Sequence, residues 1–228
     1  MRKTFAILAL FVASIASAQI QEFKPQITVA GEGKIKTAPD QALISIAVEN
    51  TGSNATEVKK QNDEATEKVV AFLKKFNLPK GDVQTQRVSL NPQYDYNKKK
   101  YSHTANQTIQ IMLKNLDQYD ALMGGLVEAG ITRVNGVTFK SSKEQQLESE
   151  ARKLAMKDAK IKAEDYVSVL NQKIGKALTI NDNSQIRYPQ PVMYMAKSEM
   201  AADAAPRETV AIGEIEIIAN VSVSFSLD

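Results

Sequence analysis

The sequence from Ser142 to Gly175 predicts one long amphipathic helix, and this helix constrains the fold more than any other part of the chain. Alanines recur along it every four residues, at Ala151, Ala155, Ala159 and Ala163, and Val167 continues the row. Leu147, Leu154, Tyr166 and Leu170 flank it. Residues four apart share one face of a helix, so this face is apolar and carries mainly small side chains. We therefore expect another backbone to approach it closely.

Charged residues of both signs cover the rest of this helix. Such a mixture is typical of a solvated surface with ion pairs between successive turns, and it argues against binding of a polyanion. The net charge of the whole chain also argues against binding of a polyanion, because it is only +3 and falls to +1 once Arg2 and Lys3 are removed. We therefore expect no nucleic-acid partner.

The first residues have the order of a secretory signal peptide. Arg2 and Lys3 precede an apolar run from Phe5 to Ile15, and Ala16-Ser17-Ala18 supplies the small residues of a cleavage site. That run is too short to span a bilayer, and no later stretch is long and apolar enough to do so. We expect residues 1–18 to be removed on export, which leaves a mature chain without a transmembrane helix.

Alternating and helical patterns follow one another along the mature chain and predict an α+β fold. Strand patterns cover residues 27–36, 42–50, 83–90, 103–115, 131–141, 176–188 and 214–227, and helical patterns cover 54–76, 117–129 and 142–175. Strands that alternate are half-buried, which favours a largely antiparallel mixed sheet packed by two or three helices. No break divides the apolar residues, so we expect residues 19–228 to form a single domain with a long loop, rich in Met, Pro and Ala, at 188–208.

Local signals set the expected ends of several elements. Asn54 to Glu57 is a capping box at a helix start, and Ser142 with Gln145 is a second capping pair before the long helix. Gly130 is expected to end the short helix in a left-handed conformation. Asn135-Gly136 is either a tight hairpin turn or a bulge, and we favour one strand with a bulge because the flanking arms are short.

Two stretches resemble the signatures of the SIMPL-domain family. One is ITVAGEGKIKTAPDQALISIAVE, and the other is the alanine-spaced helix with its following strand, EARKLAMKDAKIKAEDYVSVLNQKIGKALTI. The similarity runs from about Ile27 to Leu227. It implies a mixed α and β fold, an exported immunogenic protein of the periplasm or outer membrane, a capacity for self-assembly and a loose association with envelope or oxidative stress. It implies no reaction and no catalytic residues.

Motifs that would carry a reaction are missing or have a structural explanation. Gly31-Glu32-Gly33 lacks the third glycine and the following helix of a dinucleotide site, so a bulge or a close backbone approach explains it better. His103 is the only histidine and falls in a predicted hairpin tip, where a surface position is expected. It offers neither a histidine pair for a metal nor a plausible triad. With no cysteine in the chain, we predict a non-enzymatic protein with no catalytic residue, cofactor or metal site.

Tyr94, Tyr96 and Tyr101 lie among lysines in the same hairpin tip. Aromatic side chains are enriched in protein interfaces. We interpret these tyrosines as assembly contacts and expect a homo-oligomer, with a protein of the envelope as a further partner. The leading hypothesis for function is thus a binding or self-assembling module.

Met193, Met195 and Met200 support a second hypothesis. Their thioethers can ligate a soft metal such as Cu(I) or react reversibly with oxidant, so the loop at 188–208 could belong to a stress protein that scavenges oxidant or binds copper. Methionines that anchor an irregular loop by filling gaps are the simpler explanation. An enzyme with an unrecognised site is the third hypothesis.

The signal peptide gives a first prediction. The exported protein should begin at Gln19, because the small residues at 16–18 complete the order of charged, apolar and cleavable segments. Intact mass of the protein recovered from the cell envelope checks this. A start well upstream of Gln19 would contradict it.

Overall fold

The computed structural model describes residues 24–96, 99–184 and 212–228. The predicted signal peptide, residues 1–18, lies outside these ranges, and so does the loop at 188–208 with Met193, Met195 and Met200. Within the described ranges the chain forms three α-helices and two antiparallel sheets, which confirms the predicted α+β class.

Each sheet has its own order of strands. The strands are β1 (Gln26–Thr37), β2 (Gln41–Gly52), β3 (Val83–Asp95), β4 (Lys100–Leu113), β5 (Arg133–Lys140), β6 (Ile174–Asp182) and β7 (Ile215–Leu227). The helices are α2 (Ala55–Lys75), α3 (Tyr119–Ala129) and α4 (Glu144–Ser168), with short 3-10 turns at η1 (Lys80–Asp82) and η2 (Leu116–Gln118). One sheet has the order β1-β7-β6 and the other β3-β4-β2-β5. Strands β1 and β2 follow each other in the chain yet belong to different sheets.

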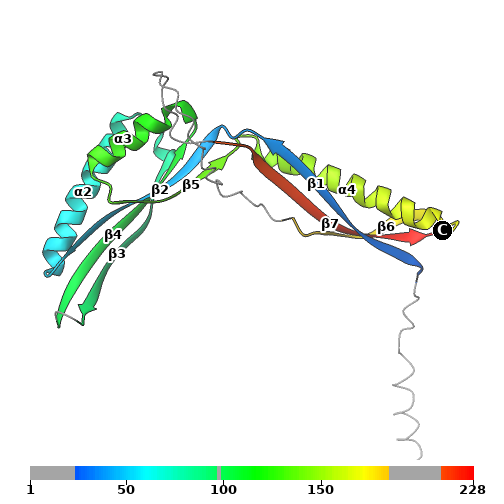
Figure 1. Cartoon of the computed structure of the whole chain (residues 1–228), viewed down its shortest axis with the longest axis horizontal. Helices are drawn as coiled ribbons and strands as arrows, with labels where there is room; N and C mark the ends of the chain where they lie inside the picture. Colours follow the sequence, from blue (N-terminus) through cyan, green and yellow to red (C-terminus); the bar gives the residue numbers. More distant parts are fainter. Residues whose placement is uncertain (1–23, 97–98, 185–211) are drawn as a thin grey trace, which may run out of the picture.

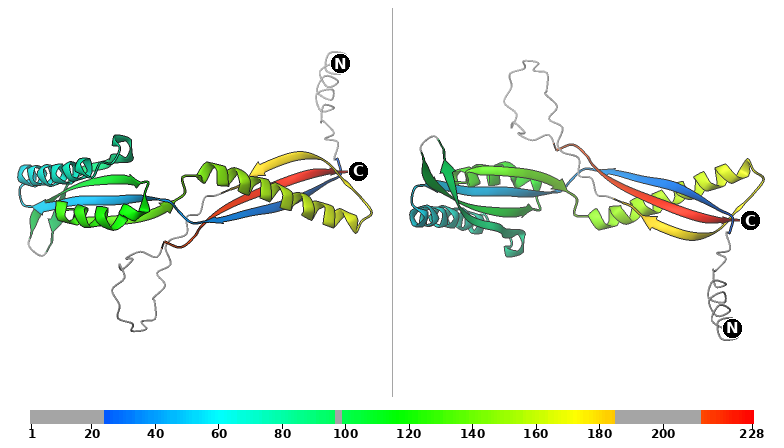
Figure 2. Two further views of the ribbon diagram at one scale, coloured as in Figure 1. Left: turned by 90° about the horizontal axis from the view of Figure 1, so that it is seen from above. Right: turned by 90° about the horizontal axis from the view of Figure 1, so that it is seen from below.

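The two sheets form two units that lie end to end in an elongated molecule (Figures 1 and 2). In one unit, α2 and α3 cover a face of the four-stranded sheet. In the other, α4 runs along a face of the three-stranded sheet. Each unit has a separate cluster of buried apolar side chains, and Ile215 at the start of β7 belongs to the cluster of the four-stranded unit.

Helix α4 packs on β1 and β7 at very short range. The alanine row at 151, 155, 159 and 163 is fully buried, as predicted. A Cβ atom on Gly31 would lie 2.1 Å from the carbonyl oxygen of Ala155, and one on Gly33 would lie 2.0 Å from that of Ala151. Only glycine fits at both positions. The close backbone approach predicted for Gly31-Glu32-Gly33 is therefore confirmed.

Polar side chains of α4 also cover the free edge of β1. The backbone N–H of Glu32 donates a hydrogen bond to Asp158 Oδ2 at 2.9 Å, and Lys162 Nζ donates to the carbonyl oxygen of Ala30 at 3.2 Å. Lys162 also pairs with Asp158 at 2.7 Å, and its hydrogen bond is the main cause that lowers the pKa of Asp158. These contacts satisfy peptide groups that an edge strand otherwise leaves open to another chain.

Three local predictions in the four-stranded unit are confirmed. The side chain of Asn54 accepts hydrogen bonds from the backbone of Thr56 and Glu57 and so caps α2. Gly130 ends α3 with a φ of 99°, in the left-handed region that favours glycine. Strand β5 is a single strand whose pairing with β2 shifts beside Ser45, which leaves Asn135 as the extra residue of a bulge.

The predicted role of Ser142 as a helix cap is wrong. Helix α4 begins at Glu144, and its N-cap residue Lys143 makes no side-chain cap. Ser142 instead donates from its backbone N–H and its hydroxyl to the carboxylate of Asp40, at 2.7 and 2.5 Å. The backbone N–H of Asp40 donates in turn to the carbonyl oxygen of Lys140 at 3.1 Å. Asp40 therefore ties the turn between β1 and β2 to the turn between β5 and α4, where the two units meet.

Three of the four side chains expected to flank the buried helix face are exposed. Leu154, Tyr166 and Leu170 retain 45%, 63% and 66% of their accessible surface, whereas Leu147 is partly buried against the core. Leu170 lies beyond the end of α4. The sheet under α4 has only three strands, so side chains beside the alanine row extend past the strands that the helix covers.

The short approach of α4 to β1 gives a matched pair of glycine substitutions. Gly31→Ala should lower the free energy of unfolding by about 1 to 3 kcal/mol, because the new methyl group meets the backbone of α4. Gly124→Ala is the control, since a Cβ there has no neighbour within 4 Å and alanine is about 1 kcal/mol better than glycine inside a helix. Urea unfolding of both variants checks this. Equal stability of wild type and Gly31→Ala would contradict the packing.

Candidate functional site

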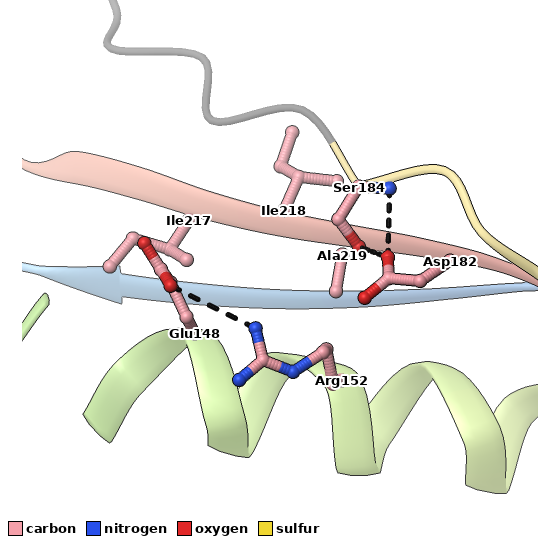
Figure 3. A pocket seen from close by; sticks show the side chains of 7 residues that line it. All are labelled: Glu148, Arg152, Asp182, Ser184, Ile217, Ile218 and Ala219. Atoms are coloured by element: carbon pink, nitrogen blue, oxygen red, sulfur yellow. Dashed lines mark hydrogen bonds and ion pairs between the residues drawn. The ribbon is translucent and has the colours of Figure 1, made fainter. Parts of the chain in front are cut away.

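A cleft of about 320 Å³ opens between α4 and the three-stranded sheet, and we call it the α4–β6 cleft (Figure 3). Its lining residues are Glu148 and Arg152 from α4, Asp182 at the end of β6, Ser184 just after that strand, and Ile217, Ile218 and Ala219 from β7. The cleft exists because α4 lies over β1 and β7 and leaves β6 largely uncovered. Leu178 and Ile180 on β6 accordingly keep 44% and 56% of their surface.

The helix side of the cleft carries an ion pair. Glu148 and Arg152 are one turn apart, and Arg152 Nη1 lies 3.8 Å from Glu148 Oε2. This separation is longer than a hydrogen bond. The side chain of Arg152 is 44% exposed and that of Glu148 is 24% exposed, so the pair is open to solvent on one side.

The strand side of the cleft is a rigid turn that holds a carboxylate. Ser184 donates to Asp182 Oδ1 from its backbone N–H at 2.9 Å and also from its hydroxyl. The Ser184 hydroxyl oxygen accepts the N–H of Asn220 at 3.1 Å, and the N–H of Asn183 donates to the carbonyl oxygen of Asn220 at 2.9 Å. The hydroxyl bond of Ser184 is the main cause that lowers the pKa of Asp182, and the positive charge of Arg152 adds to it. Asp182 is therefore ionised at neutral pH.

The cleft gathers charges of both signs. Two carboxylates flank one guanidinium above buried Ile217 and Ala219. No group of three or more histidine, aspartate or glutamate side chains able to hold a metal occurs in the described ranges. The mixture of charges on the long helix predicted only a solvated surface, and it assigned no site to Glu148 or Arg152. Asp-x-Ser at 182–184 is a turn signal, but nothing in the sequence places it beside Arg152.

The three tyrosines predicted as assembly contacts, Tyr94, Tyr96 and Tyr101, contact one another in the structure. Tyr94 and Tyr101 are directly paired across β3 and β4, with ring centroids 5.0 Å apart, and the ring of Tyr96 meets that of Tyr94 edge-on at 5.1 Å. Tyr96 and Tyr101 keep 83% and 64% of their surface. The structure thus brings the three sequence-predicted residues together in an exposed position.

Apolar residues extend this cluster along β3. Val88 and Leu90 are 66% and 40% exposed. Leu90 pairs with buried Ala105, so it lies on the face of the sheet that the helices cover elsewhere. Tyr94 follows Leu90 four residues later on that same face. We call Val88, Leu90, Tyr94, Tyr96 and Tyr101 the hairpin face. The alternation in Arg87-Val88-Ser89-Leu90 was the sequence signal for its first two members.

His103 is not at the hairpin tip. It pairs with Gly52 on β2 and with Pro92 on β3, and it is half-buried. Its Nδ1 atom is buried and has no hydrogen-bond partner in the described part of the chain. The surface position expected at the tip is therefore wrong, because β4 begins at Lys100 and already includes His103 in its pairing with β2 and β3.

The geometry defines an α+β protein of two units, with an open charged cleft in one unit and an exposed aromatic cluster in the other. Comparison with known families places it further. Residues 27–225 match the model of SIMPL, described as a protein of unknown function (DUF541), and the chain belongs to this family.

By name, the relatives are uncharacterised or periplasmic immunogenic proteins. The uncharacterized protein YggE of Escherichia coli K12 is 27% identical over 231 residues, which cover 99% of this chain and 94% of the relative. The 26 kDa periplasmic immunogenic protein of Brucella melitensis is 26% identical over 207 residues, covering 87% of this chain and 82% of the relative. In the described ranges, no helix has both the length and the apolar character needed to cross a membrane.

The Asp182 turn predicts a shift that can be measured by titration. Ser184→Ala removes the hydroxyl donor, so the pKa of Asp182 should rise towards its ordinary value of 3.8. Ser184→Thr keeps a hydroxyl and should retain most of the lowered pKa. NMR titration of the side-chain carboxyl carbon measures both variants.

The lowered pKa of Asp182 also predicts how the stability of the fold depends on pH. A carboxyl whose pKa is lower in the folded state stabilises the fold above its unfolded pKa, and this contribution is lost as the pH falls through the folded pKa. Wild type should therefore exceed Ser184→Ala in stability near neutral pH, and the difference should shrink in acid. A difference that is constant with pH would contradict the assignment.

Proposed function

We propose that this chain is a non-enzymatic protein of the cell envelope that works as a self-assembling module, with the hairpin face as its contact surface. One observation carries the proposal: five large apolar or aromatic side chains lie exposed together on one hairpin. The periplasmic name of the Brucella relative supports the envelope location. A role in envelope or oxidative stress, and any location at the outer membrane, rest on the family resemblance alone.

The composition of the hairpin face favours a protein contact. Tyrosine offers a large and rather rigid surface with a polar end, so little side-chain entropy is lost when it is buried. The ring contacts of Tyr94 with Tyr96 and Tyr101 hold the three side chains together before any partner arrives. Exposed apolar patches of this kind mark interaction sites more often than solvated surface.

A second copy of the chain is the occupant that we propose. The near-neutral net charge expected of the mature chain gives little repulsion between copies. A two-fold contact places the same patch on both partners, and two hairpins that run antiparallel keep their Lys99 and Lys100 tips apart. We expect the faces to stack rather than the β3 edges to pair, because Pro92 lacks a backbone N–H for a continued ladder.

Light scattering after size exclusion tests this prediction on residues 19–228. The wild type should be an oligomer whose mass is unchanged by high salt, because the contact is mainly apolar. Tyr101→Ser, and more strongly the triple change of Tyr94, Tyr96 and Tyr101 to Ser, should shift it towards the monomer. Tyr166→Ser is the matched control, since Tyr166 is 63% exposed and Tyr101 is 64% exposed.

Two results would contradict the proposal. One is a monomer mass for the wild type at micromolar and higher concentrations. The other is an oligomer that Tyr166→Ser weakens as much as Tyr101→Ser. Circular dichroism of each variant shows whether a loss of mass reflects a lost contact or a lost fold.

A further inference from the structure

Arg152 offers a guanidinium with unused hydrogen-bond donors. Its ion pair with Glu148 spans 3.8 Å, and among the described residues it makes no hydrogen bond. A guanidinium carries five N–H donors in a planar fork that matches a carboxylate in two-bond geometry. Arg152 also projects from the first half of α4, whose alanine row anchors the helix on the sheet, so its side chain starts from a rigid backbone. It can receive an anionic group in the cleft.

Asp182 offers an unused acceptor on the other wall. Both bonds from Ser184 reach Oδ1, and no hydrogen bond to Oδ2 occurs among the described residues. The turn is fixed to β7 through Asn220. In Figure 3 this second oxygen is directed to the side of α4. An ionised carboxylate in this position can receive an ammonium group.

The balance of charge decides which ligands fit. Glu148, Arg152 and Asp182 together carry a formal charge of −1, which disfavours phosphates and other polyanions. A simple carboxylic acid would use Arg152 but meet two carboxylates. A simple amine would use Asp182 and leave Arg152 without a partner. A ligand with adjacent carboxylate and ammonium groups complements both walls.

The remaining surface of the cleft is apolar and small. The side chains of Ile217 and Ala219 form part of the lining. Both residues are buried, with 4% and 2% of their surface accessible. A volume of about 320 Å³ is at the low end of the range for small-molecule sites. It suits a single small molecule with a short aliphatic group.

We propose that the α4–β6 cleft binds a free amino acid with an aliphatic side chain. Its carboxylate binds Arg152, its ammonium group binds Asp182, and its side chain packs on Ile217 and Ala219. This site lies in the three-stranded unit, whereas the hairpin face lies in the four-stranded unit. The inference therefore does not depend on self-assembly, and each can fail without the other.

Calorimetry and ligand-observed NMR with L-leucine test the site on residues 19–228. Leucine should bind at millimolar or lower concentration. Leucinamide lacks the carboxylate and N-acetylleucine lacks the ammonium group, so each should bind at least tenfold more weakly than leucine. The two analogues keep the aliphatic group, and so they separate charge recognition from apolar contact.

Variants locate the binding in the cleft. Arg152→Gln and Asp182→Asn should each weaken leucine binding at least tenfold, and Arg152→Lys should fall between wild type and Arg152→Gln because it keeps the charge without the planar fork. Lys153→Gln and Asp165→Asn are matched controls on exposed positions of α4, and they should bind leucine as the wild type does. Thermal unfolding of each variant confirms that it is folded.

Several outcomes would overturn the proposal. The first is no binding of leucine at millimolar concentration. The second is binding of leucinamide or N-acetylleucine as tight as that of leucine, which would show that one of the two charges plays no part. The third is leucine binding that survives both Arg152→Gln and Asp182→Asn in folded protein, which would place the ligand elsewhere.

Discussion

The close contact between the backbones of α4 and β1 is the constraint on which the three-stranded unit depends. Gly31 and Gly33 leave no space for a Cβ, and the alanine row presents only methyl groups to the sheet. Packing at this distance brings many atoms into van der Waals contact and leaves no room for a larger side chain on either partner. It also brings Asp158 and Lys162 within hydrogen-bond distance of the β1 edge. The close packing of α4 on β1 therefore accounts both for the buried alanine row and for the protection of the β1 edge.

The position of α4 has a consequence at the opposite edge of the same sheet. A helix that is drawn over β1 and β7 cannot also cover β6, so the outer strand keeps exposed apolar residues and the α4–β6 cleft remains open. The four-stranded unit repeats this arrangement. Helix α2 buries β2 and β4 but covers little of β3, where Val88, Leu90 and the tyrosines remain exposed. Both candidate surfaces therefore lie where a sheet is wider than the helices that pack on it.

At the junction of the two units, the side chain of Asp40 links two turns. Asp40 accepts two hydrogen bonds from Ser142, and they lower the pKa of its carboxyl. By the same linkage as for Asp182, this contact stabilises the junction above the ordinary pKa of aspartate and is lost as the pH falls through the lowered value. Helix α4 accordingly starts without a side-chain cap. Local sequence rules assign Ser142 to the cap of α4, but in the structure it bonds to Asp40 at the junction of the two units.

The sequence alone determined the elements, because period and capping depend on residues that are neighbours in the chain. It predicted the α+β class, the buried alanine face, the Asn54 cap, the Gly130 terminus and the bulge at Asn135. It also singled out the three tyrosines that cluster on the hairpin. Only the tertiary structure decided which strands pair, since β7 inserts between β1 and β6 although β1 precedes it by almost the whole chain. The same holds for the half-buried His103, the bond from Ser142 to Asp40 and the cleft that joins Arg152 to Asp182. Each depends on groups that are far apart in the sequence and are brought together by packing, and a local sequence pattern contains no information on such contacts.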